Sequence, residues 1–279
     1  MPYKTITAIL RGEADTASLM QRIAPLVRDF GAHVTGVHAE PSPAAHVSVL
    51  AGDMVSIDET GIEAARLRMD KVNNLFEKAC EREGISHEWR GMETFAGDSA
   101  TASIASINAT DLIVAQQIDP EQHDATFADL EALLLESGRP VLLLPCNSVA
   151  VFDPKRVVIA WKSSKEAARA VFDALPLLHR ASTVEILVID PKKSDEHSAD
   201  MAGGDIAACL NRHGIAVTIS HQKSAGIPVG EAITNRLSET GVDLLVMGGY
   251  GRSPVRELLF GGVTRTLLGS MPVPLFMAH

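Results

Sequence analysis

A cluster of glycines near the C-terminus has the residue types and spacing of a phosphate-binding loop. An apolar run is followed by Met247-Gly248-Gly249-Tyr250-Gly251, and nine residues later a helical pattern begins at Gly261-Gly262-Val263-Thr264. Glycines of the first stretch would let the backbone turn sharply beside a ligand. Those of the second would leave bare the amides of a helix N-terminus. With the helix dipole and the Thr264 hydroxyl, these amides suit an anion such as a phosphate.

The elements that must position these glycines are indicated by short apolar runs that alternate with helical patterns. The second half predicts strands over 156–161, 183–190, 216–221, 243–248 and 273–278, and helices over 165–180, 198–213, 229–240 and 262–270. The runs are apolar at consecutive positions, which is typical of parallel strands buried by helices on both faces. Alternation of strand and helix therefore predicts an open, doubly wound parallel α/β sheet.

The chain reads as two copies of one such unit. Thr5–Leu10 matches Arg156–Trp161 at an offset of 151, whereas Asp111–Ala115 matches Asp243–Met247 at an offset of 132. The first copy therefore holds about twenty extra residues, which we place within 41–60. We expect one α/β domain over residues 1–147 and a second over 154–279, each with about five strands and helices on both faces. Pairing of their last strands would join the two sheets.

Composition and charge narrow the function classes. A net charge of −10 argues against a general nucleic-acid binder. Residues 1–150 hold 11 Lys and Arg against 22 Asp and Glu, and the remaining residues hold 14 against 13, so the second half tolerates an anionic ligand better. The longest apolar runs are too short for a membrane helix, and the N-terminus has no export layout. We expect a cytoplasmic protein without membrane or nucleic-acid partners.

Motifs for catalysis and for metal binding are missing from the sequence. It holds no GxSxG, HExxH or GxxxxGK[ST] stretch, and Pro254 stands where a GxGxxG fingerprint needs its third glycine. The ten histidines and three cysteines are scattered without metal-ligand spacing. We therefore expect no catalytic residues, no protein-bound metal and at most slow ATP hydrolysis.

The spacing Gly248-x2-Gly251-x9-Gly261, followed by a helix and a final apolar strand, resembles the universal stress protein family. Ser164–Ala170 is similar to the helix after that family's first strand, and two copies in one chain resemble its tandem type. The resemblance implies Rossmann-like domains of the adenine-nucleotide α-hydrolase-like class. It also implies that the second copy binds ATP or another adenine nucleotide, with or without Mg²⁺.

Carried over position by position, the resemblance places Met247 and Gly248 beside adenine and ribose, and the backbone of Val188 at the adenine edge. The expected nucleotide-binding residues are Lys162, Val188, Met247, Gly248, Gly251, Arg252, Gly261, Gly262, Val263 and Thr264. Two positions depart from the family pattern: Gly262 replaces a Ser or Thr, and Lys162 replaces an acidic residue.

The first copy lacks the glycine motif. Gln116-Gln117-Ile118-Asp119 stands where the second copy has its first glycines, and Arg11 stands at the position of Lys162. An acidic loop follows and would repel a triphosphate. We expect this copy to bind no ATP, and to serve as a packing partner or take a different ligand.

Three functional hypotheses follow. The first is a stress-response regulator or sensor that binds an adenine nucleotide in its second domain. The second is a scaffold without nucleotide, in which the motif is a relic and the two domains form an internal pseudo-dimer, with a homodimer also open. The third is an enzyme of the wider adenine-binding α/β group, such as an ATP pyrophosphatase or a flavoprotein subunit; the lack of an SGGxDS-like loop argues against the pyrophosphatase.

Overall fold

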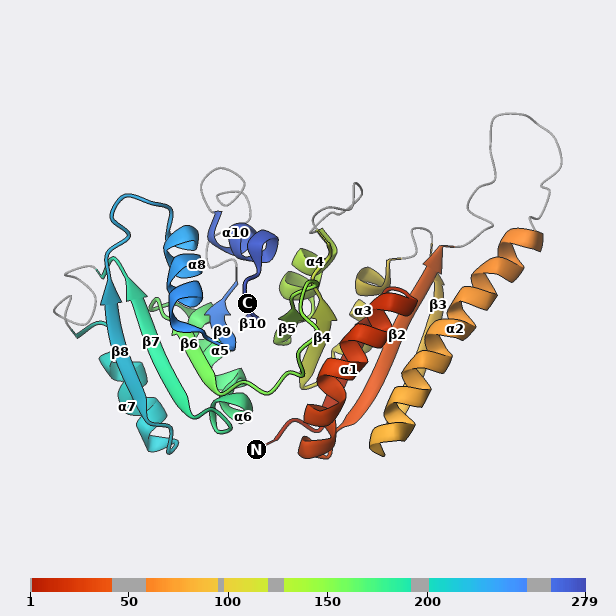
Figure 1. The fold of residues 1–279 in the computed structure, drawn as a ribbon, viewed down its shortest axis with the longest axis horizontal. Helices are drawn as coiled ribbons and strands as arrows, with labels where there is room; N and C mark the ends of the chain where they lie inside the picture. Colours follow the sequence, from red (N-terminus) through yellow and green to blue (C-terminus); the bar gives the residue numbers. More distant parts are fainter. Residues whose placement is uncertain (1, 42–58, 95–97, 120–127, 192–200, 250–261) are drawn as a thin grey trace.

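Apolar strands from both halves of the chain pair into one ten-stranded sheet in the computed structural model (Figure 1). The structure describes residues 2–41, 59–94, 98–119, 128–191, 201–249 and 262–279. The first half contributes β1 (Thr5–Leu10), α1 (Glu13–Phe30), β2 (His33–Pro41), α2 (Glu59–Glu83), β3 (His87–Thr94), α3 (Ser99–Ile107), β4 (Leu112–Gln116), α4 (Ala128–Glu136) and β5 (Val141–Leu144). The second half contributes β6 (Arg156–Ala160), α5 (Lys165–Asp173), α6 (Leu175–Leu178), β7 (Thr183–Ile189), α7 (Gly204–Arg212), β8 (Val217–Gln222), α8 (Val229–Thr240), β9 (Leu244–Gly248), α10 (Gly262–Ser270) and β10 (Leu275–Ala278).

The strand order is β3-β2-β1-β4-β5-β10-β9-β6-β7-β8, so each half lays out its strands in the same sequence from the edge to the middle. Within each half every pair is parallel, which confirms the predicted open parallel sheets. The halves meet where β5 and β10 pair antiparallel, with Phe276 opposite Leu142. The last strands of the two units therefore join the sheets, as the sequence led us to expect.

Helices cover the sheet on two faces. One core cluster combines α1, α2, α5, α6 and α7 with strand residues such as Leu10, Val114 and Val246. The other combines α3, α4, α8 and α10 with the alternate strand residues, such as Ala115 and Met247. Successive side chains on a strand point to opposite faces, so each buried strand contributes to both clusters.

Two helix boundaries differ from the prediction. The single helix expected over 165–180 is wrong, because α5 ends at Asp173 and a short α6 begins at Leu175. Pro176 lies in the first turn of α6, where its missing N–H is tolerated. At the equivalent position of the first half, Pro25 lies inside the continuous α1, so the proline alone does not account for the break. The helix predicted over 198–213 begins only at Gly204. Gly203 has a φ of +92°, which is outside the helical region, and residues 198–200 lie outside the described part.

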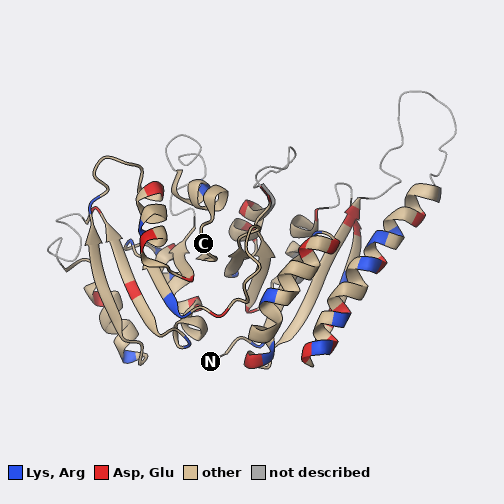
Figure 2. Ribbon diagram, viewed as in Figure 1, with Lys and Arg blue, Asp and Glu red and all other residues tan. Residues whose placement is uncertain are grey.

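Charged residues gather on the helices rather than on the strands. Figure 2 shows Lys and Arg alternating with Asp and Glu along α2, while the strands in the middle of the sheet carry few charges. Of the described helices, none combines the length and the apolar character that a membrane crossing requires.

Arg22 of α1 holds the segment that connects the two halves. Its side chain is buried, and its Nη1 and Nε donate hydrogen bonds to the carbonyl oxygens of Pro145 and Ala150 at 2.8 and 3.2 Å. The Phe152 amide donates in turn to the Arg22 carbonyl at 3.0 Å. Burial lowers the pKa of this guanidinium, because the surrounding protein replaces the water that would stabilise its charge.

Replacing Arg22 by methionine should lower the free energy of unfolding by about 2–3 kcal/mol, because two buried carbonyl oxygens lose their donors. Arg28→Met on the same helix is the matched control. Its side chain is half exposed and pairs with Glu83 at the surface, so its loss should cost less than about 1 kcal/mol. Urea titration followed by circular dichroism measures both values. Equal stabilities for the two variants would contradict the anchoring role of Arg22.

Candidate functional site

The strand order creates one crevice in each half. In the second half β6 pairs with β7 on one side and with β9 on the other. The chain therefore runs from β6 to β7 on one side and from β9 to β10 on the opposite side, so the strand order reverses between β6 and β9. Open α/β sheets bind ligands at the carboxyl ends of their strands at this reversal point. Here Lys162 stands two residues after the end of β6, and Gly248 ends β9. The fold therefore brings together two of the residues that the sequence analysis selected.

Gly248 lies against the first turn of α5. A Cβ atom at this position would stand 2.5 Å from the Ala167 amide nitrogen and 2.7 Å from the Glu166 carbonyl carbon. Real Cβ atoms do not approach backbone atoms so closely, so any larger residue would push α5 away from the sheet. Packing of protein on protein is thus one reason for glycine here, besides the ligand contact expected from the sequence.

The N-terminus of α5 already carries a negative charge. Ser164 caps the helix by accepting a hydrogen bond from the Ala167 amide at 3.2 Å, and Glu166 is buried in the first turn. Burial opposes ionisation of Glu166, but hydrogen bonds from its own amide and from Ser164, together with the Lys165 charge, lower its pKa overall. The sequence analysis missed this acid, although an acidic residue just after a Ser cap is its sequence signal. Phosphates would be repelled from α5.

The N-terminus of α10 has the opposite character. Gly262 is exposed, and the nearest atom to a Cβ built on it would be Thr266 Oγ1 at 3.5 Å. The first amides of a helix have no acceptor inside it, so they face outward with the positive end of the dipole. Thr264 is buried and Val263 half-buried. Among the described residues, no side chain therefore blocks this helix end from an anion.

Glycine also lets a neighbouring helix hold α10 in place. A Cβ at Gly230 of α8 would lie 3.1 Å from Thr266 Cβ and 3.3 Å from Val263 Cα. The two helices therefore pack at close range through Gly230, and α8 supports the turn of α10 that contains Val263 and Thr264.

The remaining predicted site residues do not share one surface. Lys162 is exposed, whereas the side chains of Val188 and Met247 are buried in different core clusters on opposite faces of the sheet. Val188 packs near Gly203, and its backbone lies within the β7–β8 ladder opposite His221, so its contact with adenine stays a prediction. Gly251, Arg252 and Gly261 lie outside the described residues.

The equivalent crevice of the first half is bridged by side chains. Arg11 follows β1, Gln116 ends β4, and Arg11 Nη1 donates to the Gln116 carbonyl oxygen at 2.7 Å across the two strands. Gln116 is buried where the second half has Gly248. The two crevices therefore share a position in the fold and differ in what fills them.

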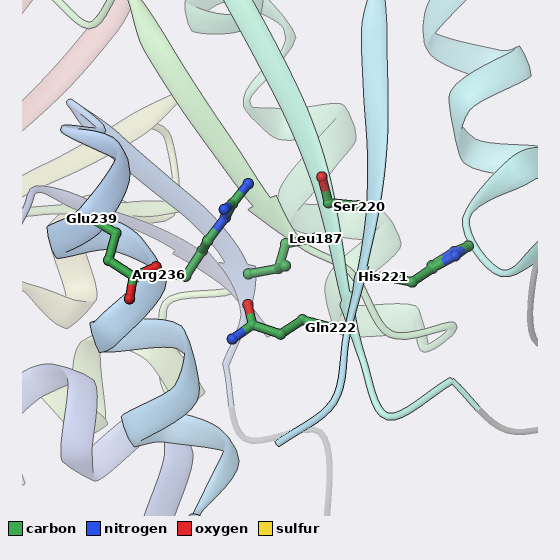
Figure 3. A pocket seen from close by; sticks show the side chains of 6 residues that line it. All are labelled: Leu187, Ser220, His221, Gln222, Arg236 and Glu239. Carbon is green, nitrogen blue, oxygen red and sulfur yellow. The ribbon is translucent and has the colours of Figure 1, made fainter. Parts of the chain in front are cut away.

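An open pocket of about 330 Å³ lies apart from both crevices, between α8 and the edge of the sheet (Figure 3). It is lined by Leu187, Ser220, His221, Gln222, Arg236 and Glu239. The His221 side chain points away from the other five, and its Nε2 lies 2.8 Å from the Ala202 carbonyl oxygen. None of the described residues predicted to bind a nucleotide lines this pocket. In the described part of the chain, no group of three or more His, Cys, Asp and Glu side chains is placed to hold a metal ion.

Comparison of the sequence with family models matches residues 154–279 to the Universal stress protein family, and the match does not extend into the first half. No curated protein sequence matches the chain significantly. The family match spans β6 to β10, with the Gly248 and Gly262 positions inside it.

Solved structures resemble the whole chain. A universal stress protein from Archaeoglobus fulgidus superposes with a TM-score of 0.69 and 17% identity over 98% of this chain and 95% of that one. A candidate universal stress protein from Pseudomonas aeruginosa gives a TM-score of 0.64, 14% identity and coverages of 98% and 92%. The cytoplasmic domain of a prokaryotic cation chloride cotransporter gives 0.54, 10% identity and coverages of 99% and 95%, so the same fold also occurs within a different kind of protein. Residues 154–279 therefore belong to the universal stress protein family, and the whole chain has the fold of universal stress proteins that it covers from end to end.

Proposed function

We propose that the protein binds an adenine nucleotide, ATP in the first place, in the crevice of its second half and acts in the cytoplasm as a stress-response regulator or sensor. The observation that carries this proposal is the N-terminus of α10, where Gly262 is exposed and no described residue lies closer to its Cβ position than Thr266 Oγ1 at 3.5 Å, in the same half as Gly248. Membership of residues 154–279 in the universal stress protein family supports it.

The residues present fit the phosphates of a nucleotide better than its base. The α10 amides would receive the phosphates, and Lys162 would add a positive charge from the end of β6. Glu166 would keep the phosphates away from α5 and so direct them toward α10. Because Val188 and Met247 are buried, the base would be recognised by backbone groups. A Mg²⁺ ion would enter with the phosphates, as protein sites commonly hold it.

A signal from the crevice has a direct path to the first half. The Gly249 amide donates to the Ala278 carbonyl at 2.8 Å, and His279 Nδ1 lies 3.1 Å from the Gly249 carbonyl. Ala278 ends β10, the strand that pairs with β5. A nucleotide that displaced Gly249 would therefore act on the junction of an internal pseudo-dimer, which leaves β3 and β8 as the outer edges for a homodimer.

The second hypothesis, a scaffold with a relic motif, is favoured by one observation. Gly248 is required by the packing of α5, so its presence does not depend on a ligand. The described residues place no comparable packing requirement on Gly262, so substitutions at the two glycines distinguish the hypotheses.

Substituting alanine at these two positions tests that separation. Gly248→Ala should lower the free energy of unfolding by at least about 2 kcal/mol, because its Cβ meets the rigid backbone of α5. Gly262→Ala should change it by less than about 1 kcal/mol, since its Cβ would meet no described atom closer than 3.5 Å. Urea titrations give both values. A tolerated Gly248→Ala would show that α5 is not in close contact with β9.

Calorimetric titration with ATP, ADP and AMP tests the nucleotide itself. Wild-type protein should release saturable heat, and Gly262→Asp should abolish it, because a carboxylate at the α10 N-terminus repels phosphates while favouring the helix. Gly269→Asp is the matched control near the other end of α10, where a Cβ atom would meet no described atom within 4 Å. It should bind as wild type does.

Two results would count against the proposal. Absence of heat with all three nucleotides would leave the scaffold hypothesis. Retained binding by Gly262→Asp would place the phosphates away from α10.

A further inference from the structure

Arg11, in the crevice of the first half, has one buried edge of its guanidinium to which no described residue hydrogen-bonds. Nη1 is held by the Gln116 carbonyl oxygen, but Nε and Nη2 are buried and lack a hydrogen-bond partner within the described part of the chain. Burying such donors without a partner costs free energy comparable to a lost hydrogen bond, and more for a charged group. Within the described residues, these two donors therefore lack the hydrogen bonds that would offset their burial.

The two free nitrogens form one side of the fork. Nη1 lies on the Cδ side of the guanidinium, so Nε–H and Nη2–H point the same way from the opposite edge. Two parallel N–H donors match the two oxygens of a carboxylate, which is the strongest pairing that arginine makes. Because Arg11 sits at the reversal point between β1 and β4, this edge lies where open α/β sheets take their ligands.

Two further buried groups of the first half lack hydrogen-bond partners within the described residues. Thr16 Oγ1, in the first turns of α1, and Gln116 Oε1 are both buried and unpaired within the described residues. Val114 packs on the α1 side of the sheet and Ala115 on the other, so alternation turns Gln116 toward α1. In the second half a Cβ at the equivalent Gly248 meets the first turn of α5, so Gln116 is directed to the first turn of α1, near Thr16.

Asp15 does not complete the guanidinium. Its Oδ2 accepts the backbone N–H of Arg11 at 3.0 Å, and no ion pair joins the two side chains although both are described. Burial raises the pKa of the Asp15 carboxyl, which the nearby Arg11 charge only partly offsets. No described carboxylate therefore pairs with the side chain of Arg11.

We propose that the first half binds a small carboxylate with a hydroxyl or ammonium group on the adjacent carbon, a 2-hydroxy or 2-amino acid, through Nε and Nη2 of Arg11. The neighbouring hydroxyl or ammonium group donates to Gln116 Oε1 and is close to Thr16. This site is separate from the nucleotide crevice, and its outcome does not depend on the function proposed above.

Arginine side-chain NMR of the full chain tests this site, with glycolate, acetate, glycolamide and inorganic phosphate as probes at constant ionic strength. Glycolate should shift the Arg11 Nε–Hε signal saturably and acetate more weakly, whereas neutral glycolamide should leave it in place. The signal is assigned in the wild type through its bonds to the Arg11 backbone, so the test does not require a stable variant.

Substitutions give a second measurement. Arg11→Gln should remove carboxylate binding, and Arg11→Lys should weaken it about tenfold, because lysine keeps the charge and loses the fork. Arg28→Gln, on the exposed end of α1, is the control and should bind glycolate as wild type does. An Arg11 signal that glycolate and acetate do not move would overturn the proposal. A signal that responds to glycolamide equally, or to phosphate alone, would also overturn it.

Discussion

In each half the first strand has parallel neighbours on both sides, and this pairing constrains the rest of the structure. The chain must leave the flanking strands in opposite directions, so the carboxyl ends of β1 and β4, and of β6 and β9, border a crevice. The residue after the first strand and the residue that ends the fourth then decide its chemistry. The same two positions of the fold are thus occupied by Arg11 and Gln116 in the first half and by Lys162 and Gly248 in the second.

Helix packing and ligand chemistry meet at the same residues. Glycine at 248 allows α5 to approach the sheet, whereas the buried Gln116 fills the equivalent space in the first half. The two helix ends in the second half differ in charge, because Glu166 occupies the end of α5 while Gly262 leaves the end of α10 bare. An anion would therefore be repelled from the N-terminus of α5 and attracted to the N-terminus of α10.

Much of the fold could be predicted, because it depends on local pattern. Apolar runs placed β6, β7 and β9 within a residue of their observed bounds, and the glycine spacing indicated the family to which residues 154–279 belong. The break between α5 and α6 was missed because the proline pattern does not signal it: Pro25, at the equivalent position of the first half, lies inside the continuous α1. The Ser164 cap signals a charged helix start at Glu166, but the burial of Glu166 and the unpaired edge of Arg11 depend on the folded chain and could not be predicted. The nucleotide contacts themselves stay predictions.

The central claim is that the two crevices differ, so that a single nucleotide binds per chain. Native mass spectrometry of the full chain with increasing ATP measures this stoichiometry directly. The account predicts saturation at one nucleotide per chain. A second nucleotide bound with similar affinity, or none at any concentration, would contradict it.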